Sequence, residues 1–145
     1  MTLDNFIQEY NGTYQEYNND QFKFQCMDLF WMYLKEVLGI DPKPYQGWGT
    51  AKNCYNNFSI IKNASTYFQK VPNGPYNAPQ RGDIVFWGTY PFVTGWAGHV
   101  GICTSAGVYA LVSFDQNYGR PNFCEVNKRF LFLVKVNCPG FLSPS

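Results

Sequence analysis

Residues 22–38 read FKFQCMDLFWMYLKEVL, and this stretch carries the clearest structural signal in the chain. Its apolar side chains recur in steps of three and four, at Phe22, Cys26, Leu29, Phe30, Tyr33, Leu34, Val37 and Leu38. This spacing places them along one stripe of a helix. Gly39 and the prolines at 42 and 44 are typical of a C-terminal stop. The pattern predicts an amphipathic helix with Cys26 in or near its first turn.

Shorter elements are predicted on the C-terminal side of this helix. Thr50 begins a second helix that ends near Phe58, with Thr50 as N-cap. Residues 1–21 are polar and rich in Asn, and no element is predicted there. Runs of β-branched and aromatic residues, separated by turn residues, predict strands at 83–87, 99–104, 108–114 and 130–136.

Helices precede strands in this order, which predicts an α+β fold with an antiparallel sheet. The chain has 145 residues, the size of one domain. We expect the domain to span residues 1–138 and residues 139–145 to form a C-terminal tail or the start of a linker.

Composition excludes several classes of protein. A net charge of +1 gives no electrostatic footprint for nucleic acid. No stretch reaches the ~20 apolar residues of a membrane span, so no membrane insertion is expected. The first residues lack the basic start and apolar run of a secretory signal, so we expect synthesis in the cytoplasm and another route to any outside target. The five cysteines form no CxxC pair, which favours reduced thiols.

His99 is the single histidine, so any acid–base chemistry by an imidazole passes through it. It lies between Gly98 and Gly101 at the start of a predicted strand, where the glycines leave room for a close neighbour. Among the thiols, Cys26 differs from the others because amides at a helix N-terminus favour a thiolate. The same amides can bind an oxyanion. The other four cysteines are interpreted as small buried hydrophobes.

A third group is needed to orient the imidazole of an activated thiol pair. Asp115 and Asn117 close the strand that follows His99, and their spacing of two puts both on one side of an extended segment. Either side chain can accept a hydrogen bond from the ring. A structural histidine with a buried cysteine remains the alternative interpretation of the same spacing.

Four segments, in order, resemble the successive signatures of the CHAP family of cysteine, histidine-dependent amidohydrolase/peptidase domains. They are Gln25-Cys26-Met27-Asp28-Leu29, Gly82–Trp87, Gly98–Ile102 and Asp115-Gln116-Asn117. Residues 49–53 are similar to the family's intermediate Gly-Asn-Ala segment. The resemblance covers about residues 20–136 and implies a papain-like core. The residues of the first segment are similar to those of bacteriophage endolysins of Gram-positive hosts.

The resemblance implies hydrolysis of an amide bond in peptidoglycan. Cys26 then corresponds to the nucleophile and His99 to the base. Asp115 fills the family's usual acidic position, where glutamate is more common, and Asn117 matches the polar residue two positions further on. The backbone amide of Cys26, with the Gln25 side chain, corresponds to the oxyanion site.

Rings near the signatures are candidates for a substrate groove, with core packing as the alternative for each. They are Trp48, Trp87, Trp96 and Tyr118. Some phage members carry an acidic calcium loop before the Gln-Cys pair, but here both expected aspartates are replaced and Lys23 adds a positive charge. Asp20 and Asp28 remain candidate calcium ligands, since calcium prefers several carboxylate oxygens. We therefore expect no required cofactor and no bound metal.

Two other functions fit parts of the same sequence. Cell-wall cysteine peptidases of the NlpC/P60 type commonly orient the base with a second histidine, which this chain lacks. A non-catalytic wall-binding module is compatible with an aromatic content of 19%. The sequence leaves open whether an amidase or an endopeptidase is present. It also leaves open whether the chain acts as a lysin at the end of infection or as a virion enzyme. The expected partner is bacterial peptidoglycan, with a further wall-binding domain or partner chain.

Overall fold

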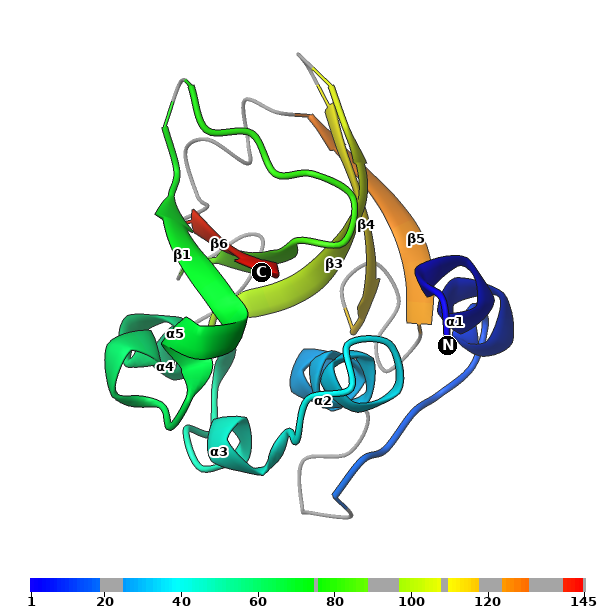
Figure 1. The fold of residues 1–145 in the computed structure, drawn as a ribbon. Helices are drawn as coiled ribbons and strands as arrows, with labels where there is room; N and C mark the ends of the chain where they lie inside the picture. Colours follow the sequence, from blue (N-terminus) through cyan, green and yellow to red (C-terminus); the bar gives the residue numbers. More distant parts are fainter. Residues whose placement is uncertain are drawn as a thin grey trace.

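The computed structural model describes residues 1–18, 25–74, 76–88, 97–107, 110–117, 124–130 and 140–144. Helices come first along the chain and strands follow (Figure 1). The helices are α1 (Leu3–Tyr10), α2 (Cys26–Glu36), α3 (Lys43–Gln46), α4 (Ala51–Asn56) and α5 (Ala64–Tyr67), with a 3₁₀ turn at Phe58–Ile60.

The described strands form one six-stranded sheet in the order β1-β6-β2-β3-β4-β5. They are β1 (Phe68–Pro72), β2 (Ile84–Trp87), β3 (His99–Ala106), β4 (Ala110–Gln116), β5 (Cys124–Phe130) and β6 (Gly140–Pro144). Every pairing between them is antiparallel. The predicted α+β fold with an antiparallel sheet is confirmed.

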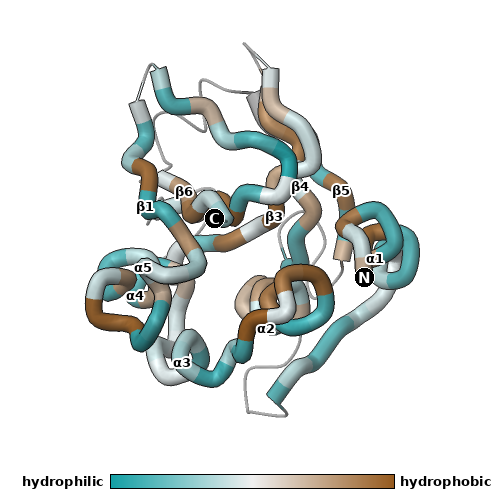
Figure 2. Tube along the Cα trace, in the orientation of Figure 1, coloured by the Kyte–Doolittle hydropathy of each residue, from teal (hydrophilic) through white to brown (hydrophobic). Residues whose placement is uncertain are grey.

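Helix α2 is the central packing element. Its eight residues from Met27 to Leu34 are all buried, and Phe30 contacts Phe86 of β2 edge to face, with 5.9 Å between ring centroids. The helix begins at Cys26 with Gln25 as N-cap, and Gly39 beyond it adopts a φ of 67°, which favours glycine. The predicted helix is therefore confirmed over Cys26–Glu36, with its first turn at the cysteine; it ends two residues before Leu38, and residues 22–24 lie outside the described residues. Figure 2 shows hydrophobic colour on α2 and on the strands, whereas the segment after α1 is mostly hydrophilic.

The second predicted helix is confirmed as α4. Thr50 is its N-cap, and the Thr50 hydroxyl accepts a hydrogen bond from the Asn53 amide. The helix is shorter than expected and ends at Asn56, because the chain continues into the 3₁₀ turn.

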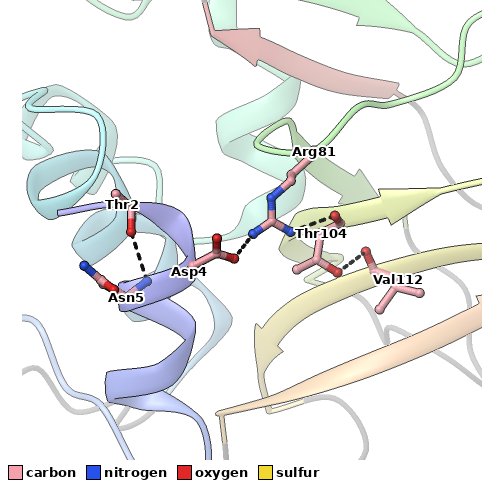
Figure 3. Close-up of polar contacts among 6 residues, drawn as sticks. All are labelled: Thr2, Asp4, Asn5, Arg81, Thr104 and Val112. Carbon is pink, nitrogen blue, oxygen red and sulfur yellow. Dashed lines mark hydrogen bonds and ion pairs between the residues drawn. The ribbon is translucent and has the colours of Figure 1, made fainter.

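Helix α1 lies in a stretch where the sequence interpretation placed no element. Phe6 is fully buried, and its ring contacts Tyr33 of α2 and Phe114 of β4. Thr2 caps the helix by accepting from the Asn5 amide, and Asp4 pairs with Arg81 (Figure 3). Arg81 also donates to the Thr104 carbonyl of β3. These contacts attach the N-terminal helix to the sheet.

The C-terminal strand corrects the expected domain boundary. Gly140–Pro144 pairs with β1 on one side and β2 on the other, so the expectation of a tail or linker at 139–145 is wrong for these residues. Phe141 and Leu142 are buried, and their side chains supply the apolar contacts that a linker lacks. Two apolar residues between Gly140 and Ser143 give little periodic signal in the sequence.

The remaining strands agree with the sequence in part. Strands at 83–87 and 99–104 are confirmed, and β3 continues two residues further, to Ala106. The strand predicted over 108–114 is described from Ala110 and reaches Gln116. The strand predicted over 130–136 lies almost entirely outside the described residues. Within the described ranges, none of the helices has the length and apolar character that crossing a bilayer requires.

Candidate active site

Cys26 occupies the first position of helix α2, and its side chain is partly exposed. The turn that contains it, from Gln25 to Asp28, is closed by two hydrogen bonds. The Gln25 amide donates to Asp28 Oδ2 at 2.8 Å, and the Asp28 amide donates to the Gln25 carbonyl at 3.1 Å. The thiol therefore lies at the positive end of the helix dipole.

His99 begins strand β3 and is only 4% exposed. Gly98 before it has a φ of 71°, and a Cβ on Gly98 would lie 2.7 Å from the Trp87 carbonyl oxygen. Only glycine fits at this close approach of β2 to the start of β3. The Trp87 ring lies against the imidazole, with 5.5 Å between ring centroids.

Asp115 lies beside this imidazole from the neighbouring strand β4. Its Oδ2 is 3.3 Å from His99 Nε2, and the residue is fully buried. Two more side chains hold the carboxylate: Ser113 Oγ donates to Oδ2 at 2.9 Å, and Asn127 Nδ2 donates to Oδ1 at 2.6 Å. Gly101 makes room for it, because a Cβ there would lie 2.7 Å from Oδ2.

The thiol and the imidazole are electrostatically coupled. Burial by itself lowers the pKa of His99, but the negative charge of Cys26 and a hydrogen bond with Asp115 outweigh it and raise the pKa to about 9. A hydrogen bond with Cys26 acts in the same direction. Since Nε2 faces Asp115, Nδ1 is the ring nitrogen that remains for the thiol. With its pKa raised to about 9, the imidazole is protonated at neutral pH.

Asn117 has a different partner from Asp115. Its Nδ2 donates to Gln25 Oε1 at 2.9 Å, and its φ of 62° is one that asparagine tolerates. The sequence left open whether Asp115 or Asn117 lies against His99. The described geometry brings Asp115 to the imidazole of His99 and Asn117 to the side chain of Gln25, next to Cys26.

Comparison with known proteins bears on this arrangement of cysteine, histidine and acid. The pattern of the CHAP domain matches residues 15–117, which include Cys26, His99 and Asp115. The chain belongs to the CHAP domain family. A comparison with curated protein sequences gives no match.

Solved structures are similar to this CHAP domain in fold. The crystal structure of Ly7917 superposes with a TM-score of 0.69 at 19% identity, covering 97% of this chain and 60% of that one. Ly7917 with the hydrolyzing product of MDP gives 0.70 at 21%, with the same coverage. The wild-type endolysin LysIME-EF1 gives 0.71 at 18%, covering 99% of this chain and 64% of that one. The chain thus spans less than two thirds of the length of these proteins.

The four aromatic side chains that were predicted to line a substrate groove differ in where the structure places them. Trp87 is 2% exposed and packs on His99, so the structure does not support its assignment as a substrate contact. Trp48 is half-buried, and its indole donates to the Pro44 carbonyl at 3.2 Å. Its contact with substrate stays a prediction. Trp96 and Tyr118 lie outside the described residues.

Of the two candidate calcium ligands, the structure describes Asp28. Both carboxylate oxygens of Asp28 accept backbone hydrogen bonds, from Tyr17 at 3.1 Å and from Gln25 at 2.8 Å. The residue is 1% exposed, and its observed role is to close the turn that contains Cys26. Asp20 lies outside the described residues. Within the described ranges, no three His, Cys, Asp or Glu side chains gather as ligands of a metal ion.

The other described cysteines of the CHAP domain are buried and form no disulfide bond. Burial raises the pKa of Cys54, Cys103 and Cys124 to about 12 in each case. Such thiols are protonated at neutral pH and react slowly. Cys138 lies outside the described residues. Among the described thiols, Cys26 is therefore the one placed for chemistry.

Three side chains around the site were missed from the sequence. Ser113 lies two residues before Asp115 on the same face of β4, a spacing that was available but weak. Asn127 lies on β5, a strand that the sequence interpretation did not include. Gln116 lies inside a quoted signature, but its contacts join segments about a hundred residues away, and no local pattern shows them.

Proposed function

We propose that this chain is a peptidoglycan hydrolase that cleaves an amide bond through the thiol of Cys26. The observation that carries the proposal is the thiol at the first position of α2, coupled to a buried imidazole that lies 3.3 Å from a buried carboxylate. This is the layout of an activated thiol nucleophile with an oriented base. Membership of the CHAP family supports the substrate class, as does the Ly7917 structure with the hydrolyzing product of MDP.

In the first step the Cys26 thiolate attacks the amide carbonyl carbon, and the carbonyl π electrons move onto its oxygen. The backbone amide of Cys26 and the side-chain amide of Gln25 bind this oxyanion. Asn117 assists indirectly, because its contact with Gln25 Oε1 turns the NH₂ end of that amide away from itself.

The imidazolium of His99 then gives its proton to the leaving amine, the C–N bond breaks and a thioester remains on Cys26. In the second step His99 removes a proton from water, which attacks the thioester and releases Cys26 as thiolate. Asp115 keeps the ring in the orientation that serves both steps. The position of Asp115 supports its assignment as the orienting residue.

The test compares Cys26→Ser with the unaltered protein on a suspension of susceptible cell walls. Turbidity and newly released amino groups are measured, and we expect the rate to fall by roughly 10³-fold or more because the nucleophile is lost. The matched controls are Cys54→Ala and Cys103→Ala, which remove buried thiols of high pKa. Their rates should stay within a few-fold of the unaltered protein. Undiminished lysis by folded Cys26→Ser would refute the mechanism.

The bond that is cut is part of the same proposal. An amidase separates the lactyl group of the sugar from the first alanine, whereas an endopeptidase cuts within the stem peptide or the cross-bridge. Both reactions present an amide carbonyl to the same thiol, and mass spectrometry of the soluble products distinguishes them. Wall binding without any release of amino groups would identify a non-catalytic module instead. We assign the chain to a phage lysin because it is similar to endolysins. Lysis is measured after the protein is added outside the cells and after it is produced inside them, and these two measurements test that role.

A further inference from the structure

Gln116, the last residue of β4, is fully buried next to the start of helix α2. Its side-chain amide makes four hydrogen bonds. Oε1 accepts from the Gln15 amide at 2.8 Å and from Cys124 Sγ at 3.0 Å. Nε2 donates to the Gln15 carbonyl at 2.9 Å and to the Gln25 carbonyl at 2.8 Å. Both donors and both acceptor positions of the amide are therefore used.

These contacts allow one orientation of the amide. Its oxygen faces a backbone N–H of Gln15 and its nitrogen faces the carbonyl of the same residue. A rotation by half a turn would oppose oxygen to oxygen and nitrogen to nitrogen. The Nε2 bond to Gln25 is consequently held in a fixed direction, because the pairing with Gln15 prevents the amide from turning away.

The Gln25 carbonyl belongs to the peptide bond that joins Gln25 to Cys26. A peptide unit is planar, so the direction of its carbonyl oxygen fixes the direction of the N–H of the next residue. The same carbonyl accepts from the Asp28 amide in the first helical turn, at 3.1 Å. Two donors from different parts of the fold thus set the plane that carries the Cys26 amide.

We propose that Gln116 is a positioning residue for the nucleophile, which it orients by holding the Gln25 carbonyl. It sets the direction of the Cys26 N–H and the placement of the Cys26 thiol against His99. The oxyanion part rests on the proposed function, whereas the effect on the thiol concerns the reactivity of Cys26 alone. A purely structural Gln116 would affect the stability of the fold and leave the reactivity of the folded protein unchanged.

The test uses Gln116→Leu in the full chain, which removes the amide and keeps a side chain of similar size. The rate of Cys26 alkylation by iodoacetamide is followed from pH 5 to pH 10 by mass spectrometry of peptides, which separates the five cysteines. We expect the rate at neutral pH to fall roughly tenfold, since small displacements at reacting groups have large effects. On cell walls, kcat should fall while KM stays unchanged, because Gln116 is buried away from substrate.

Two controls separate positioning from stability. Ser143→Ala removes a hydrogen bond to the buried carboxylate of Asp83 at another part of the sheet. Cys124→Ala removes the thiol contact with Gln116 Oε1 and keeps the contact with Gln25. Both should lower the melting temperature and leave the alkylation profile of Cys26 unchanged. Equal changes in the profile for these controls and for Gln116→Leu would overturn the proposal.

A folded Gln116→Leu with the unaltered alkylation profile would also overturn it. Gln116→Asn keeps the amide on a side chain that is one methylene shorter. Its rate of Cys26 alkylation should lie between the rates of the unaltered protein and of Gln116→Leu. If both variants fail to fold, NMR of the unaltered protein decides. Alkylation of Cys26 should shift the Gln116 side-chain amide signals, and signals that do not move contradict the proposal. A normal alkylation profile without wall hydrolysis would refute the proposed function and leave the positioning role standing.

Discussion

His99 has two neighbours with different effects on its charge. The negative charge of Cys26 and a hydrogen bond with Asp115 favour the imidazolium, and burial opposes it. Because the ring is 4% exposed, water screens these interactions little. The protonation state of this residue therefore depends on the presence of both partners.

The single histidine makes this dependence measurable. In an NMR titration its one set of imidazole signals should give a pKa of about 9. In Cys26→Ser the pKa should fall well below 9, because burial is then opposed by Asp115 alone. Asp115→Asn should lower it as well. Ser143→Ala removes a hydrogen bond to Asp83 and is the control. It should leave the pKa of His99 unchanged.

The direction of the shift also fixes the pH dependence of stability and activity. A folded-state pKa of about 9, above the ordinary 6.5, means that the imidazolium stabilises the fold fully below pH 6.5. This contribution is lost as the pH rises through about 9. Hydrolysis should decline over the same alkaline range because the proton donor for the leaving amine disappears. An activity that keeps rising beyond pH 10 would contradict this assignment.

At the residue scale, the sequence predicted Cys26 and His99 as the reactive pair and offered two candidates for the third group. It could not choose between Asp115 and Asn117, because alternation along a strand puts both on one side. The choice depends on the backbone at Asn117, which turns to a positive φ of 62° and takes its side chain to Gln25. That turn follows from contacts with a segment 92 residues away.

Among the elements, β3 and β4 are in close contact where Asp115 meets Gly101, two residues from His99. Asp115 packs directly on Gly101, where a side chain has no room. The missing side chain of this one glycine is what permits the carboxylate to lie flat against the strand that carries His99.

Gly101→Ala tests this packing. The new Cβ would lie 2.7 Å from Asp115 Oδ2 and 3.0 Å from its Cβ, so the carboxylate must move away from His99. We expect wall hydrolysis to fall roughly tenfold or more, as displacement of an orienting group costs rate. The pKa of His99, followed by NMR, should fall at the same time.

Gly47→Ala is the matched control for this substitution. Its Cβ would meet nothing within 4 Å, and Gly47 has a φ of −74° that alanine adopts readily. Its hydrolysis rate and its His99 titration should equal those of the unaltered protein. The packing argument fails if Gly101→Ala matches Gly47→Ala in both measurements.

The helices differ in how strongly their sequences predict them. Helix α2 has a long apolar stripe and a glycine stop, and α4 has a threonine cap. Helix α1 carries its apolar residues at Leu3, Phe6, Ile7 and Tyr10, a helical spacing that is short and lies in a polar stretch. A single turn or two of helix is marginal by itself, and packing of Phe6 against α2 and β4 stabilises it.

In the whole molecule, the C-terminal strand joins two parts of the sheet. Strand β6 lies between β1 and β2, so it connects the edge strand after the helices with the strands that carry the site. Leu142 is fully buried in the main core. The end of the chain is thus needed for a continuous sheet.

Leu142→Ala should destabilise the fold by about 2–5 kcal/mol. The substitution leaves a cavity in the core, and the surrounding side chains move only partly into it. Urea unfolding followed by circular dichroism measures the loss. Leu38→Ala removes the same atoms from a half-buried position and should cost less. Equal losses for the two variants would show that β6 does not pack as described.

The sequence by itself determined the helix that carries Cys26 in its first turn, the strand that begins at His99 and the α+β order of elements. These depend on local periodicity, caps and turn residues, which neighbouring residues carry. The tertiary structure alone decided which acid meets His99, that Trp87 is buried, that β6 enters the sheet and that Gln116 holds the Gln25 carbonyl. Each of these joins residues far apart in the chain, so it depends on how strands and helices pack and not on any local pattern.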